Sequence, residues 1–293
     1  RGRGAPSRMS VSPLNERYEE LGDALRAEVL DKEEWKARTK EHEKKKPDTK
    51  RPRVYVLDFE GDILASQVAH LREEVTALLA VLRPEDEVVL RLESPGGGVA
   101  HYGLAAAQLT RLKDKKAKLT VCVDRVAASG GYMMACVADT IVAAPFAVIG
   151  SIGVIAAVPN VHRLLKKHEV DYEELTAGEF KRTVSTFGEI TDKGRAKFVE
   201  QLEETHALFK DFVKTQRPAL DVSAVSTGEY WLGRRAKELG LVDQLGTSDD
   251  YLLSRVGQAS VYSVRFRPAA QWRQRIGDFV LASLARWQSL TLR

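Results

Sequence analysis

Residues 87–98, EVVLRLESPGGG, join an apolar run to a proline and three glycines. Glu87–Leu92 predicts a buried strand, and Ser94–Gly98 must end it, because proline and consecutive glycines break regular structure. Val99–Leu112 follows with the spacing of a helix. A strand, a glycine-rich turn and a helix in this order are typical of a parallel sheet.

The same alternation continues on both sides of this stretch. Val54–Phe59 predicts the preceding strand, Val68–Leu82 the helix between the two strands, and Lys118–Val123 the strand that follows. Strands that alternate with helices indicate an α/β fold with a mostly parallel sheet.

The run Thr140–Val158 contains no charged residue in 19 positions, which is long enough for a membrane span. Pro145, Gly150 and Gly153 interrupt it, and its β-branched residues suit short strands. We therefore expect short buried strands joined by a turn.

The two ends of the chain differ in character from this core. Ser12 and Pro13 predict a helix start, with Ser12 as the N-cap and Pro13 in the first helical position. Val261–Phe266 alternates like a strand, and residues 271–290 have the pattern of a basic amphipathic helix that packs on a sister subunit or lies on a membrane. The expected parts are a disordered tail (1–11), a helix with a charged linker (12–52), the core domain (53–250) and a C-terminal strand with the amphipathic helix (251–293).

Composition excludes several classes of protein. Of 293 residues, 44% are hydrophobic and 29% charged, so a sizeable core is expected rather than disorder. A net charge of +4 gives no reason to expect a nucleic-acid partner. The two cysteines, Cys122 and Cys136, lack metal-ligand spacing, so we expect buried small hydrophobic residues and no metal site.

The glycine turn at Ser94–Gly98 is the first candidate for chemistry. Its backbone N–H groups would suit one side of an oxyanion hole. A phosphate cradle or a simple tight turn are the alternatives, and a P-loop is excluded because no Gly-Lys-Ser/Thr follows.

The second candidate is Ala127–Tyr132, AASGGY, at another junction of strand and helix. Ser129 would lie at the helix N-terminus, whose partial positive charge favours an oxyanion, and the N–H of Gly130 is a natural donor. The competing interpretation is that Ser129 is an ordinary N-cap.

A nucleophilic serine needs a base. None of the six histidines has a catalytic context, and His101, after the glycine turn, is expected on the surface of the following helix. Lys181, in Gly178–Arg182, can serve if its pKa falls toward neutrality, and the adjacent Arg182 would favour this if it lies close.

Four motifs in order then produce a specific resemblance: Ser94–Gly98, Ala127–Tyr132, Gly150–Val154 and Ala236–Asp243. Together they closely resemble the signal peptide peptidase A family of Ser/Lys peptidases, in its SohB-like branch, over roughly residues 53–250.

The resemblance implies a role for each matching residue. Ser129 corresponds to the nucleophile, Lys181 to the general base and Ser151 to a serine that orients the lysine. Gly97 and Gly130 correspond to the oxyanion donors. The implied fold is ClpP/crotonase-like, with stacked β-β-α units.

The resemblance further implies a homo-oligomeric ring or dome at a bacterial inner membrane, with active sites near the subunit interfaces. It leaves two arrangements open, because Ser129 and Lys181 could meet within one subunit or across two. Its substrates would be membrane-associated peptides, such as remnant signal peptides, or membrane protein fragments, cleaved without a cofactor. Met133, Val148, Ile149 and Ile152 would give an apolar lining for small or hydrophobic side chains. Two other functions stay open from the residues: a crotonase-type acyl-CoA enzyme and a non-catalytic membrane scaffold.

Overall fold

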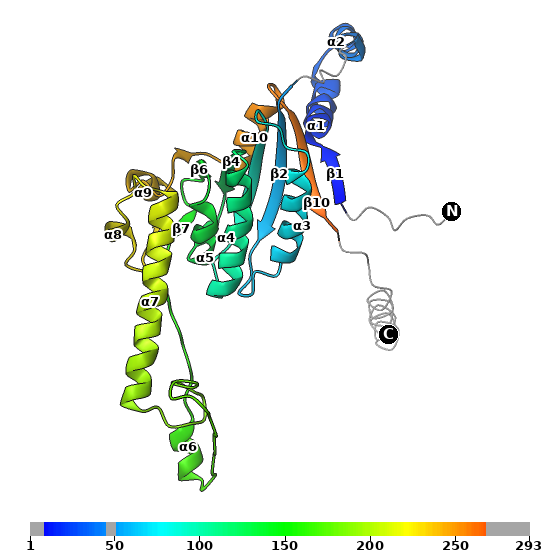
Figure 1. The fold of residues 1–293 in the computed structure, drawn as a ribbon. Helices are drawn as coiled ribbons and strands as arrows, with labels where there is room; N and C mark the ends of the chain where they lie inside the picture. The colour runs from blue at the N-terminus through cyan, green and yellow to red at the C-terminus, as the bar shows by residue number, and fades with distance from the viewer. Residues whose placement is uncertain (1–8, 45–50, 268–293) are drawn as a thin grey trace, which may run out of the picture.

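The computed structural model describes residues 9–44 and 51–267, which form a main sheet, a small second sheet and a projecting arm (Figure 1). The main sheet has seven strands. In spatial order they are β1 (Met9–Pro13), β10 (Ser260–Phe266), β2 (Arg53–Glu60), β3 (Glu87–Glu93), β4 (Lys118–Val123), β6 (Thr140–Ala143) and β9 (Gln244–Leu245). All neighbours are parallel except β1, which pairs antiparallel with β10.

Both faces of this sheet are buried, which explains the apolar runs of its strands. On one face, Leu57, Leu90 and Val121 belong to the larger core cluster. This face is covered by α3 (Val68–Leu79), α4 (Val99–Asp114) and α5 (Gly130–Ala135). On the other face, Val56 and Val89 belong to a smaller cluster with residues from α1 (Leu14–Val29) and α10 (Ser248–Val256).

The second sheet contains β5 (Val126–Ala128), β7 (Val148–Gly150) and β8 (Tyr230–Leu232), followed by α9 (Gly233–Glu238). β5 and β7 run parallel, and β8 is antiparallel to β7. An isolated bridge between Ser94 and Ala127 connects the end of β3 to β5. This bridge places the glycine turn beside the strand that ends immediately before Ser129.

The arm is formed by α6 (His162–Lys167) and the long helix α7 (Asp192–Gln216), with the segment between them. Thr191 caps α7 by accepting the N–H of Gly194 at 3.0 Å. In Figure 1, α6 and the start of α7 lie at the far end of the arm, and the chain returns along α7 toward α8 (Val222–Val225).

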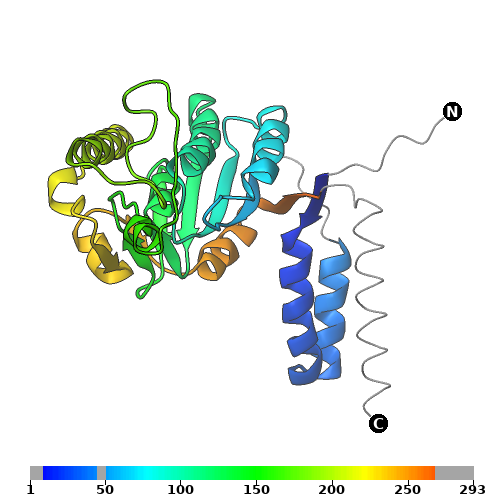
Figure 2. The ribbon, with the colours of Figure 1, turned by 90° about the horizontal axis from the view of Figure 1, so that it is seen from below.

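At the other side of the molecule, α1 and α2 (Lys32–Lys44) project from the sheet edge as a pair (Figure 2). The predicted helix start at Ser12 and Pro13 is wrong by one residue, because both belong to β1 and the helix begins at Leu14, with Pro13 in the N-cap position. Met9–Val11, expected in a disordered tail, also belong to β1, whose partner β10 lies about 250 residues away in the chain.

The sheet takes strands from both sides of the limits predicted at residues 53 and 250, since β1 and β10 belong to it. The helix α10 was not predicted, and the amphipathic helix predicted over residues 271–290 lies outside the described residues. Thr140–Val158 contains the two short strands β6 and β7, as predicted. Over residues 9–44 and 51–267, every helix is too short or too polar to cross a bilayer.

Candidate active site

Ser129 and Ser151 lie side by side because each follows the last residue of a paired strand. Ala128 of β5 is opposite Gly150 of β7 in a parallel ladder, and the next residue in each strand is a serine. The N–H of Ser129 donates to the carbonyl of Gly150 at 2.7 Å. Both serines have positive φ, 52° and 51°. The chain is therefore sharply bent at the end of both strands.

The conformation of Ser129 argues against the interpretation that it is an ordinary N-cap. It precedes α5, but its φ of 52° and ψ of −119° are not those of a capping residue, and its side chain makes no capping hydrogen bond. A non-glycine residue in this region costs about 1–3 kcal/mol, and such strain gathers at functional sites. The hydroxyl of the half-buried Ser129 is thus not used by the helix.

The glycine turn leaves one N–H available beside Ser129. Gly96 N–H donates to the Ser94 hydroxyl at 3.1 Å, and Gly98 N–H donates to the Ile63 carbonyl at 2.8 Å. The N–H of Gly97, between them, has no hydrogen-bond partner among the described residues. Gly96 has a φ of 91°, and a Cβ there would lie 2.7 Å from Cβ of Ser129. Only glycine lets the turn approach the serine this closely.

Gly97, Ser129 and Gly130 line the same small hollow, of about 20 Å³. The structure therefore brings both predicted oxyanion donors to the predicted nucleophile. The rest of the lining is mostly apolar and comes from four segments: Val99, Met133, Gly153, Val154, Thr205 and Phe209.

The apolar lining differs in part from the prediction. Met133 borders the hollow, but Ile149 and Ile152 are fully buried in the larger core cluster, and Val148 is not part of the lining. Thr205 and Phe209, on α7, were not predicted because they are about 75 residues away from Ser129 in the chain. Their position on a long amphipathic helix was the only signal in the sequence.

Lys181 is not brought to Ser129 within the chain. It is exposed and belongs to the segment between α6 and α7, at the far end of the arm from α5 (Figure 1). Within the described residues, no hydrogen bond joins Lys181 to Ser129 or Ser151. The adjacent Arg182 pairs with Glu174 at 3.0 Å.

Among the histidine side chains that the structure describes, none hydrogen-bonds to Ser129. His101 is exposed on α4, as expected. His206, on α7, has its Nε2 3.2 Å from the carbonyl of Ile152, and no hydrogen bond connects it to Ser129. Burial raises the pKa of Cys122 to about 12 and the pKa of Cys136 further, so both thiols remain protonated and unreactive.

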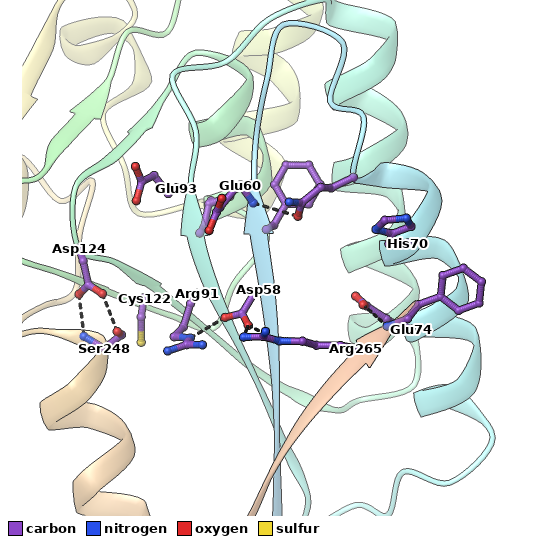
Figure 3. A pocket seen from close by; sticks show the side chains of 14 residues that line it. Asp58, Glu60, His70, Glu74, Arg91, Glu93, Cys122, Asp124, Ser248 and Arg265 are labelled. Carbon is purple, nitrogen blue, oxygen red and sulfur yellow. Dashed lines mark hydrogen bonds and ion pairs between the residues drawn. The ribbon is translucent and has the colours of Figure 1, made fainter. Parts of the chain in front are cut away.

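A larger pocket, of about 400 Å³, lies elsewhere, at the carboxyl ends of β2, β3 and β4 (Figure 3). Its centre is Asp58, which accepts from Arg91 at 2.6 Å on one side and from Arg265 at 2.7 Å on the other. None of the predicted site residues lines it. Among the described residues, no cluster of acidic, histidine or cysteine side chains is arranged to hold a metal ion.

Comparison with known proteins agrees with this geometry. The model of "Peptidase family S49" matches residues 111–261, and that of "Peptidase family S49 N-terminal" matches residues 1–109. A "Probable protease SohB" of Haemophilus influenzae is 55% identical over 276 residues, covering 88% of this chain and 78% of that protein. A second protein of that name, from Buchnera aphidicola, is 51% identical over 240 residues, covering 82% of this chain and 70% of that one.

Among solved structures, a mutant of the 1510-N membrane-bound stomatin-specific protease superposes with a TM-score of 0.42 at 15% identity. The superposition covers 70% of this chain and 84% of the solved one. The mostly parallel main sheet confirms the expected α/β fold class. The family matches confirm the resemblance found in the motifs, and the chain is a serine peptidase that belongs to peptidase family S49.

Proposed function

We propose that this chain is an endopeptidase that cleaves membrane-associated peptides with Ser129 as nucleophile and Lys181 as general base. The observation that carries the proposal is the hollow shared by Ser129, Gly97 and Gly130. There an uncommitted hydroxyl lies beside two glycines whose N–H groups have no partner among the described residues.

The reaction follows from this arrangement. A neutral Lys181 amine takes the proton of Ser129 as its oxygen attacks the peptide carbonyl. The N–H groups of Gly97 and Gly130 stabilise the oxyanion, and each donor contributes about 3 kcal/mol to lowering the barrier. Lys181 then gives its proton to the leaving amine, and a water molecule hydrolyses the acyl-enzyme with Lys181 again accepting a proton.

The lysine, in this proposal, comes from a second copy of the chain. Lys181 is exposed on the arm, and large apolar side chains are exposed there too, with Leu175 on the arm at 86% and Ile155, on the segment that leads to α6, at 90% exposure. Exposed apolar surface of this kind favours association. In the assembly, Ser151 would lie beside the incoming amine and orient it.

The apolar lining of the hollow supports substrates with small apolar side chains at the cleavage point, such as remnant signal peptides or fragments of membrane proteins. We place the enzyme at the inner membrane of a bacterium, as the resemblance implies. Separation of cell membranes from soluble fractions tests this location, and recovery of the protein only in the soluble fraction would refute it.

The test of the function is cleavage of a fluorogenic peptide with a hydrophobic, signal-peptide-like sequence. Ser129→Ala and Lys181→Ala should each lower kcat by at least about a thousandfold. Lys193→Ala is the matched control, because Lys193 is another exposed lysine of the arm, with 68% of its side chain accessible. Equal cleavage by wild type and Ser129→Ala, with oligomeric state unchanged by gel filtration, would refute the proposal.

A further inference from the structure

Two buried hydroxyls, of Ser94 and Tyr102, lie directly behind the glycine turn. Both residues are 0% exposed, and their oxygens are 2.5 Å apart. Ser94 is the first residue of the turn, and Tyr102 is on α4, which packs against α5. Neither residue is part of the catalytic mechanism described above.

The hydrogen bonds of this pair run in one direction. The Tyr102 hydroxyl donates to the carbonyl of Asp62 at 2.8 Å, and a carbonyl can only accept. The Ser94 hydroxyl must therefore donate to Tyr102, while its oxygen accepts the N–H of Gly96 at 3.1 Å. Burial, as the main effect, raises the pKa of Tyr102, which keeps the donating proton in place.

This chain of bonds fixes the glycine turn next to Ser129. It begins at Gly96 N–H, one residue before Gly97, and ends on the loop after β2. Two backbone hydrogen bonds also hold Ser94 to β5. The N–H of Ser94 donates to the carbonyl of Val126 at 2.8 Å, and the N–H of Ala128 donates to the carbonyl of Ser94 at 3.0 Å. The turn therefore cannot shift along β5 without breaking buried hydrogen bonds.

The ring of Tyr102 also fixes the second oxyanion donor. A Cβ added to Gly130 would lie 2.3 Å from Cγ of Tyr102, so the ring is in contact with the backbone of Gly130. The backbone of Gly61 packs against the hydroxyl end of the same side chain, because a Cβ there would lie 2.3 Å from the Tyr102 hydroxyl. One side chain thus touches Gly130 with its ring and holds the turn before Gly97 with its hydroxyl.

We propose that Tyr102, through Ser94, is a positioning residue that aligns the N–H groups of Gly97 and Gly130 with the oxyanion formed at Ser129. This inference rests on the proposed function and adds a specific residue to it. Without the Tyr102 hydroxyl, the Ser94 proton loses its acceptor and the bond to Gly96 N–H loses its orientation, because hydrogen bonds in such chains support one another.

The test compares Tyr102→Phe with Tyr132→Phe. Tyr132 is a matched control, since it is also 0% exposed and its hydroxyl donates to a backbone carbonyl, that of Leu241, at 3.0 Å. Tyr102→Phe should lower kcat for peptide cleavage by about tenfold or more, a part of the loss expected for a whole oxyanion donor, with KM within about twofold. Tyr132→Phe should keep both constants within about twofold.

A double-mutant cycle separates positioning from general support of the fold. Ser94→Ala breaks the same chain of bonds, so the double variant Ser94→Ala/Tyr102→Phe should be no slower than the slower single variant. Multiplied losses would overturn the inference, as would equal losses in Tyr102→Phe and Tyr132→Phe, or a normal kcat in Tyr102→Phe. If Tyr102→Phe does not fold, the kcat of Ser94→Ala decides.

Ser129→Ala distinguishes this inference from the proposed function. If Ser129→Ala still cleaves the peptide, the proposed function itself is wrong. If Ser129→Ala is inactive and Tyr102→Phe is fully active, only the positioning role is wrong.

Discussion

Adding a single methyl group at Gly130 should damage both stability and catalysis. In Gly130→Ala the new Cβ would lie 2.3 Å from Cγ of Tyr102, whereas ordinary contacts begin at 3.4 Å, so one of the two must move by about 1 Å. The Tyr102 ring is fully buried and has no free space to enter. Overpacking of this kind costs about 1–3 kcal/mol of folding free energy.

The same displacement acts on the candidate oxyanion hole. A shift of about 1 Å takes the Gly130 N–H out of hydrogen-bonding range, and the loss of one such donor lowers kcat by about a hundredfold or more. We therefore expect Gly130→Ala to show both a lower urea midpoint and a kcat reduced beyond what its folded fraction explains.

Gly103→Ala is the matched control. Gly103 follows Tyr102 on α4, and a Cβ there would meet nothing within 4 Å. This variant should gain about 0.5–1 kcal/mol, because alanine is a better helix former, and should cleave at the wild-type rate. Urea unfolding followed by circular dichroism, with peptide cleavage on the same samples, measures both effects. Wild-type stability and wild-type kcat in Gly130→Ala would refute the reasoning.

Three further experiments test other parts of the structure. Burial alone would raise the pKa of Asp243, but hydrogen bonds from Arg217 and from a backbone N–H lower it below its usual 3.8. The ion pair of Asp243 with Arg217 therefore stabilises the fold at neutral pH. This stabilisation is lost as the pH falls through the lowered pKa of Asp243. Asp243→Asn should lower the free energy of unfolding by about 2 kcal/mol at neutral pH, which is less than the loss of a fully buried ion pair would cause. In urea unfolding, the difference in stability from wild type should shrink toward pH ~3. A difference that grows on acidification would contradict this. The buried thiols of Cys122 and Cys136 should react with a maleimide only after unfolding, and rapid labelling of native protein would show that the core is open. Met133→Ala should enlarge the hollow and shift cleavage toward peptides with larger apolar side chains, as measured by kcat/KM across a peptide series, and an unchanged preference would exclude Met133 from the specificity pocket.

Local patterns predicted the elements around Ser129. The strand, turn and helix at Glu87–Leu112 follow from apolar periodicity and the glycine run, and the structure has β3, the turn and α4 there. The helix α10 also had a local signal, because Thr247 and Asp250 form a capping pair, with Asp250 N–H donating to the Thr247 hydroxyl at 3.1 Å.

Features that depend on distant parts of the chain were not predictable in the same way. β1 is a strand because it pairs with β10, and its own sequence, with a proline, favours a helix start. Likewise, the approach of α7 to the hollow and the exposure of Lys181 arise from how the arm packs. Residue type and spacing made Ser129 and Lys181 candidates, and the resemblance implied their roles, but neither showed that one chain leaves the two apart.

Catalysis as proposed requires a serine and a lysine that meet across two copies of the chain. Co-expression of Ser129→Ala and Lys181→Ala chains, each inactive alone, tests this directly, because a mixed assembly contains interfaces with one intact Ser129 and one intact Lys181. Peptide cleavage by the purified mixed assembly is the predicted result. A mixed assembly with no more activity than either variant alone would contradict the account.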